Sequence, residues 1–234
     1  MLRELLAIFR SDHPLKEMGE NFERMLRVTY EMTREAGKIY FEEVVAPEER
    51  SSIYRRDIEV NKLERTIRKQ VIAHLSLKGS SPSLPYCLLL MSLVKDAERI
   101  GDYAKNLSEV REYHPDPLPT DEYVAELLSL REGVERAFSV TAEVFAASDH
   151  ERAVALIREG RTITHRCDML VARVAASAYG AADATAVVMG TRFYKRIAAH
   201  VLNILSSVVM PLHKLDYYDE DEIRPPGYES RKED

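Results

Sequence analysis

The stretch "EYHPDPLPTDE", residues 112–122, divides the chain into two similar halves. It holds three prolines within five residues, which interrupt a helix, and then Thr120, Asp121 and Glu122, which are typical of a helix start. We interpret it as a rigid hinge between two groups of helices.

Both sides of this hinge show helical periodicity. Apolar residues recur at steps of three and four, sustained alternation is absent, and glycine is scarce at nine residues. The expected helices cover residues 14–45, 47–79, 84–111, 121–147, 149–178 and 184–216. We therefore predict an all-α fold of two tandem antiparallel three-helix bundles, with six long helices related by an internal repeat.

Two local alignments support the repeat. A shift of 97 places "ERIGDYAKNL", from Glu98, over "KRIAAHVLNI", from Lys195. A shift of 104 places Asn61 over His165 and Glu64 over Asp168. We assign residues 1–114 to the first bundle, residues 120–217 to a second, degenerate bundle, and residues 218–234 to an acidic flexible tail.

Composition excludes several classes of protein. The chain has 33 basic and 39 acidic residues, which argues against nucleic acid as its main partner. Its two cysteines, Cys87 and Cys167, lie in apolar stretches and indicate neither a disulfide framework nor a zinc site. No stretch approaches the roughly 18 apolar residues of a membrane-spanning helix. We expect a cytoplasmic protein.

Glu98, Asp102 and Asn106 are candidate metal ligands, because residues four apart lie on one line of a helix, about 5–6 Å apart. Neighbouring carboxylates repel one another unless a cation compensates them. A divalent metal could do so. Two surface ion pairs are the alternative, because Lys95 is three residues before Glu98 and Lys105 three residues after Asp102.

Small residues run beside these carboxylates, at Ala97, Gly101, Ala104 and Ser108. They would let another helix approach closely and partly desolvate the acids. The preceding helix supplies further candidate ligands in Asp57, Asn61 and Glu64, which share one face. Together these oxygens suit a hard divalent cation. A solvated face balanced by nearby arginines is again the alternative.

The motif "ERIGDYAKN", preceded by "VNKLERTI" in a chain of two three-helix halves, resembles the PhoU family of phosphate-uptake regulators. Family members carry an E/DxxxD motif followed by alanine and asparagine on the third helix of each half. Glu98, Asp102, Ala104 and Asn106 match it. The resemblance implies bound divalent metal, here iron, zinc, manganese or magnesium, and repression of the phosphate regulon by coupling an importer to a sensor kinase.

The second half departs from the family pattern. Lys195 and Ala199 stand where the two carboxylates are expected, so we expect at most one metal site. His165 and His200 lie at positions equivalent to Asn61 and Tyr103, and a packing or solvent-facing role is more common for such lone histidines than a ligand role.

The leading hypothesis is a regulatory adaptor that resembles PhoU and binds a membrane transporter, a sensor kinase or both. It would contact the membrane only through that partner, and could form a homo-oligomer. The alternative is a metal-free helical interaction module that regulates another ion-transport system. We do not expect an enzyme: a di-iron carboxylate protein needs Glu-x-x-His pairs, and no histidine has a glutamate three residues before it.

Overall fold

The structure, a computed structural model, describes residues 13–42, 47–77 and 81–215. Within these ranges every regular element is helical, so the all-α prediction is confirmed. The long helices are α2 (His13–Phe41), α3 (Pro47–Leu75), α4 (Leu84–Tyr113), α5 (Glu122–Ala147), α6 (His150–Ala175) and α7 (Ala181–Val209). Two short 3-10 turns, Ser81–Ser83 and Leu212–Lys214, precede α4 and follow α7.

Helix ends follow local chemistry. The Asp121 carboxylate accepts hydrogen bonds from the amides of Tyr123 (2.9 Å) and Val124 (3.1 Å), and so caps the start of α5. The last helix ends at Val209, whereas we predicted residue 216, because Pro211 holds the preceding residue in an extended conformation. The predicted tail, residues 218–234, lies outside the described residues, as does the predicted end of the first helix at 45.

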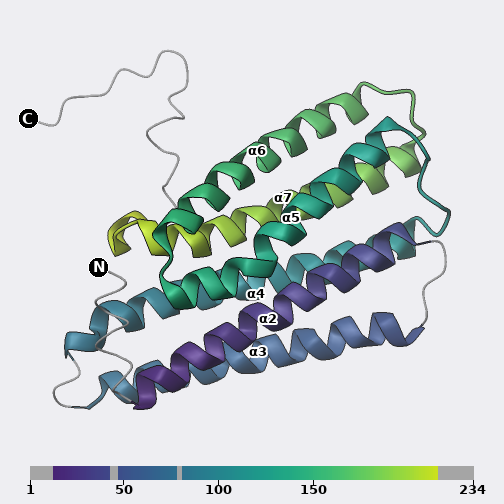
Figure 1. Cartoon of the computed structure of the whole chain (residues 1–234). Coiled ribbons are helices and arrows are strands. Elements are labelled where there is room, and N and C mark those ends of the chain that lie inside the picture. Colours follow the sequence, from purple (N-terminus) through teal and green to yellow (C-terminus); the bar gives the residue numbers. More distant parts are fainter. Residues whose placement is uncertain (1–12, 43–46, 78–80, 216–234) are drawn as a thin grey trace, which may run out of the picture.

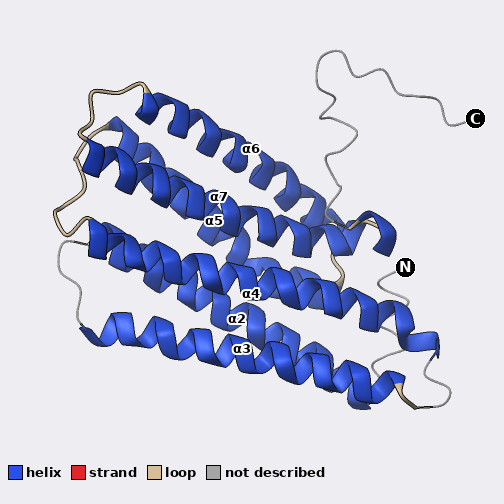
Figure 2. Ribbon diagram, turned by 180° about the vertical axis from the view of Figure 1, so that it is seen from behind, coloured by secondary structure: helices blue, strands red, loops and turns tan. Residues whose placement is uncertain are grey.

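The helices form two groups of three (Figure 1). Helices α2, α3 and α4 pack against one another, and so do α5, α6 and α7. The two groups meet through contacts of α4 with α7 and of α2 with α5. Figure 2, seen from behind, shows the same arrangement, with α3 and α6 at opposite margins of the molecule. No helix in the described ranges is long and apolar enough to cross a membrane.

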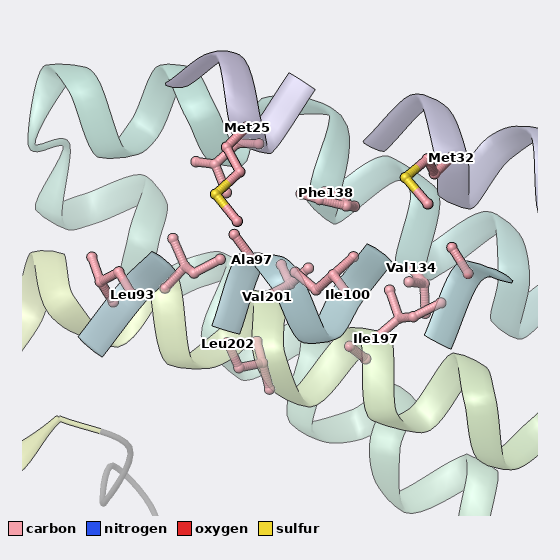
Figure 3. Packing of buried hydrophobic residues seen from close by; sticks show 14 of the residues in the cluster. Met25, Met32, Leu93, Ala97, Ile100, Val134, Phe138, Ile197, Val201 and Leu202 are labelled. Carbon is pink, nitrogen blue, oxygen red and sulfur yellow. The ribbon is translucent and has the colours of Figure 1, made fainter. Parts of the chain in front are cut away.

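One hydrophobic core passes through both groups. Figure 3 shows side chains of α2, α4, α5 and α7 packed into it. Its labelled members are all buried, and comprise Met25, Met32, Leu93, Ala97, Ile100, Val134, Phe138, Ile197, Val201 and Leu202. Because the halves share this core, their assignment as separate domains, at 1–114 and 120–217, stays a prediction.

Two buried tyrosines, one in each half, each pack against a glycine of the other half. Tyr40 of α2 lies over Gly190 of α7, and its hydroxyl donates to the carbonyl of Ala186 at 2.9 Å. Tyr194 of α7 lies over Gly37 of α2. A Cβ atom at Gly190 would lie 2.4 Å from the Tyr40 hydroxyl oxygen, and one at Gly37 would lie 2.5 Å from that of Tyr194. Each glycine is therefore required for the close approach of a tyrosine from the other half.

Candidate functional site

The carboxylate line of α4 runs beside a helix contact, as expected. Ala97, Gly101 and Ala104 are buried, and a Cβ atom at Gly101 would lie 3.6 Å from the Thr29 side chain of α2. Small residues thus admit α2 closely. The adjacent acids are partly desolvated as a result, with side chains 14% exposed for Glu98 and 29% exposed for Asp102.

Basic side chains of the same helix neutralise both acids. Lys95 Nζ lies 2.7 Å from Glu98 Oε2, and Lys105 Nζ lies 3.6 Å from Asp102 Oδ1. Arg99 adds a further contact of 3.2 Å from Nη1 to Asp102 Oδ2. The two ion pairs that formed the alternative to a metal are therefore both present.

Lys105 also links α4 to α3. Its Nζ lies 3.3 Å from Asp57 Oδ1, and Asn61 Nδ2 donates to Asp57 Oδ2 at 3.4 Å. Burial lowers the pKa of Lys105, but the opposing charge of Asp57, supported by Asp102, raises it above its usual value overall. The Lys105 ammonium group thus lies between Asp57 and Asp102, two of the predicted metal ligands, and Asn61 contacts Asp57 from the other side of that carboxylate.

Glu64 is the most buried of the predicted acidic ligands, with a side chain 10% exposed. Arg68 Nη2 lies 2.8 Å from Glu64 Oε1, close enough for an ion pair. The direction of approach does not satisfy a hydrogen bond, however, and Glu64 Oε1 and Arg68 Nε are both buried without a hydrogen-bond partner. The two groups still form an ion pair, because opposite charges this close attract one another at any angle.

These contacts decide how well the predicted ligands fit a metal. Each of the four carboxylates already has a basic partner. Within the described ranges, moreover, no three His, Cys, Asp or Glu side chains are grouped closely enough to hold a metal ion. As placed, the four carboxylates of Glu98, Asp102, Glu64 and Asp57 do not fit a divalent-metal centre, and a ligand role for Asn61 and Asn106 stays a prediction.

The second half contains an ion pair between helices at the equivalent place. Lys195 Nζ on α7 lies 2.5 and 2.6 Å from the two carboxylate oxygens of Asp168 on α6. His165 is exposed and His200 packs between helices, as we expected for lone histidines.

Sequence reasoning missed one polar cluster at the junction of the halves. The buried Asp96 of α4 lies 2.7 Å from His200 Nδ1 and accepts from Asn203 Nδ2 at 2.9 Å, both on α7. The His200 ring stacks on Tyr103 with centroids 5.7 Å apart. The repeat alignment placed Tyr103 and His200 at equivalent positions, but could not indicate that they meet.

Comparisons with known proteins agree with this architecture. PhoU from Pseudomonas aeruginosa has a TM-score of 0.77 at 16% identity, covering 88% of this chain and 99% of that one. The phosphate transport system regulatory protein PhoU from Streptococcus pneumoniae has a TM-score of 0.69 at 16% identity, covering 83% and 92% respectively. A search of curated proteins found no match.

The fold is therefore the all-helical bundle seen in these two PhoU structures. Residues 22–110 match the family model of the PhoU domain, and the resemblance to the PhoU family is confirmed.

Proposed function

We propose that this chain is a cytoplasmic regulatory adaptor that controls phosphate transport and phosphate-dependent gene expression by binding a transporter, a sensor kinase or both. The observation that carries the proposal is the PhoU domain over residues 22–110, set in a fold that covers 99% of a known PhoU chain. A scaffold whose halves share one core presents fixed helix faces to a partner, which suits a role in docking rather than in chemistry.

Such a role does not need a metal at the carboxylate line. Lysine and arginine side chains of the chain itself supply the compensating charge that a divalent cation would otherwise provide. This observation favours an adaptor without metal but does not identify the solute; the second candidate function is a metal-free helical module that regulates another ion-transport system. The two candidates share the adaptor mechanism and differ in the solute.

A reporter assay distinguishes the solute. The gene is deleted in its own host, and expression from a phosphate-starvation promoter is measured in phosphate-rich medium. We expect expression to rise on deletion and to return to its original level when the full chain is restored. An unchanged reporter would rule out the phosphate assignment and leave the alternative.

Elemental analysis of the purified full chain addresses the metal separately. We expect no first-row metal at a stoichiometric level, in the original chain or in Asp102→Ala. Iron, zinc or manganese near one per chain, lost in Asp102→Ala, would instead establish the predicted site and overturn our interpretation of the ion pairs.

A further inference from the structure

Glu48, in the first turn of α3, is exposed, but from residue 51 onward the outward face of this helix carries cations, apolar and hydroxyl side chains and no exposed acid. Between residues 51 and 77 the exposed residues are Ser51, Tyr54, Arg55, Ile58, Lys62, Arg65, Thr66, Lys69, Ile72, Ala73, Ser76 and Leu77. None is aspartate or glutamate, in a chain with more acids than bases. The nearest half-buried acid, Glu59, is held by Arg24 at 2.6 Å.

Among the described residues, no acid neutralises the cations of this face. Arg55, Lys62, Arg65 and Lys69 form no ion pair with any described residue, whereas the half-buried Arg68 contacts Glu64 at 2.8 Å. An uncompensated row of positive charge raises the local potential and attracts acidic partners.

The exposed side chains follow the spacing of a helix-packing seam. Positions 55, 58, 62, 65, 69 and 72 advance by three and four in turn, so they share one stripe of the helix. We call these six residues the α3 stripe. It spans about 26 Å at a rise of about 1.5 Å per residue. Its apolar members, Ile58 and Ile72, are 53% and 63% exposed.

The stripe lies on an open side of the fold. Helix α3 packs against α2 and α4, and it forms one margin of the molecule in both views (Figures 1 and 2). The corresponding helix of the other half, α6, does not share this composition, because its exposed face mixes Glu151, Glu159 and Asp168 with arginines. The charge imbalance of α3 is thus not repeated in its counterpart α6.

We propose that the α3 stripe binds an acidic amphipathic helix of a partner protein, with carboxylates opposite the four cations and apolar side chains against Ile58 and Ile72. The inference rests on the proposed adaptor function and specifies the chemistry of the partner. Helices dock along such stripes through anchors spaced by three and four residues. Charge complementarity then sets orientation and rejects basic competitors.

A membrane surface fits the stripe less well. Helices that lie on lipid keep an uninterrupted apolar face towards the acyl chains and place their lysines and arginines on the opposite, polar face. In the α3 stripe, cations and isoleucines alternate along one line, so inserting Ile58 would bury Lys62 and Arg55 as well. An acidic helix satisfies both kinds of side chain at once.

The test uses the purified full chain and a synthetic probe. The probe is a fluorescent helical peptide of about 21 residues with leucine and glutamate along one face. Its control carries lysine in place of every glutamate. The variant Lys62→Glu/Arg65→Glu/Lys69→Glu reverses the stripe, and Arg158→Glu, an exposed arginine on α6, is the matched control variant. Fluorescence anisotropy measures binding at about 0.05 M and about 0.5 M salt.

We expect the original chain and Arg158→Glu to bind the acidic peptide equally, the triple variant to bind it at least about tenfold more weakly, and high salt to weaken binding. Because the changed residues are exposed, the melting temperature should not move, and circular dichroism checks this. Equal binding by the triple variant, equal binding of the lysine peptide, or no binding at about 1 mM probe would each overturn the proposal. So would stripe-dependent binding to phosphatidylserine vesicles without peptide binding.

The reporter assay separates this inference from the proposed function. If deletion raises expression and the triple variant restores repression fully, the docking inference fails while the adaptor function stands. If deletion leaves the reporter unchanged but the peptide result holds, the phosphate assignment fails and the binding surface stands.

Discussion

Replacement of Gly190 by alanine tests whether the tyrosine contacts couple the two halves. The added Cβ atom would lie 2.4 Å from the hydroxyl oxygen and 2.5 Å from Cζ of Tyr40. Tyr40 is fully buried and its hydroxyl donates to the Ala186 carbonyl, so the ring has no free space into which to move. Either the hydrogen bond or the spacing between α2 and α7 must give way.

Three terms set the size of this effect. Overpacking a dense core costs about 1–3 kcal/mol. Displacing the Tyr40 hydroxyl from its acceptor costs about 1–3 kcal/mol, because the group is then buried without a partner. Alanine gains about 1 kcal/mol of helix propensity over glycine. The free energy of unfolding should therefore fall by about 3 kcal/mol, which corresponds to about 6–12 °C in melting temperature for a chain of this size.

Gly101→Ala is the matched control, because it makes the same change at another buried helical glycine. Its Cβ atom would lie 3.6 Å from Thr29 and 3.7 Å from Met32, which is ordinary contact. We expect unchanged or slightly raised stability. Thermal and urea unfolding, followed by circular dichroism, measure both variants. If Gly190→Ala melts no earlier than the original chain, or if Gly101→Ala loses as much stability, then the reciprocal contacts do not hold the halves together as we infer.

Three further predictions follow from single sites. Lys105→Met should lower the free energy of unfolding by about 1 kcal/mol at neutral pH, because Asp57 loses its partner. Because the pKa of Lys105 is raised in the folded chain, its contribution to the free energy of unfolding is fully present below its usual pKa and is lost as pH rises through the folded-state pKa. The free energies of unfolding of the two chains, measured by urea titration, should therefore converge at strongly alkaline pH. Burial raises the pKa of the Cys167 thiol to about 12, so iodoacetamide at pH 8 should modify it only after unfolding, and mass spectrometry of labelled peptides would reveal any native reaction. Asp121→Ala should lower the free energy of unfolding by about 1 kcal/mol, because the cap of α5 and the Tyr179 contact are lost. Partial burial raises the pKa of Asp121, but hydrogen bonds from Tyr179 and the α5 amides lower it below its usual value overall, so the stabilisation by Asp121 should disappear on acidification. Equal acid sensitivity of the two chains would contradict this prediction.

The helices were predictable because local signals decide them. Asp121 lies at a helix start in the sequence, and apolar residues recur at helical spacing between the loops. The error at the end of α7 arose because apolar periodicity carried the prediction past Pro211, whose effect on the preceding residue ends the helix. Contacts between the halves were not predictable in this way. A helical pattern identifies a buried face, but it does not show that Tyr40 meets Gly190 or that Asp96 meets His200.

The sequence predicted the partial burial of the candidate acids but not their partners. Glu98 and Asp102 are partly buried beside small residues, as the spacing indicated, whereas only Asp57, Asn61 and Asp102 of the six candidates are linked to one another, through Lys105 and Asp57. Whether a metal or a side chain neutralises them depends on where long, flexible lysines and arginines settle. Lys105 could have paired within α4 alone, and instead it also reaches Asp57 across the helix contact. The packing of α3 on α4 determines this pairing, and residue spacing within one helix does not predict it.

The two halves pair the charged residues at equivalent positions differently. The repeat alignment equates Glu64 with Asp168 and Glu98 with Lys195. In the second half, therefore, the equivalent positions hold opposite charges, and they bind each other directly between α6 and α7 at 2.5 Å. In the first half both positions are acidic, so each acid takes a cation from its own helix, Arg68 for Glu64 and Lys95 for Glu98. A pair between helices holds them together, whereas pairs within a helix do not. In the first half, α3 and α4 are joined by Lys105 with Asp57, together with Tyr54 with Glu109 and Arg50 with Glu112. Of these, the ion pair of Lys105 with Asp57 is the counterpart of Lys195 with Asp168, because it involves a lysine of the third helix and an aspartate of the second.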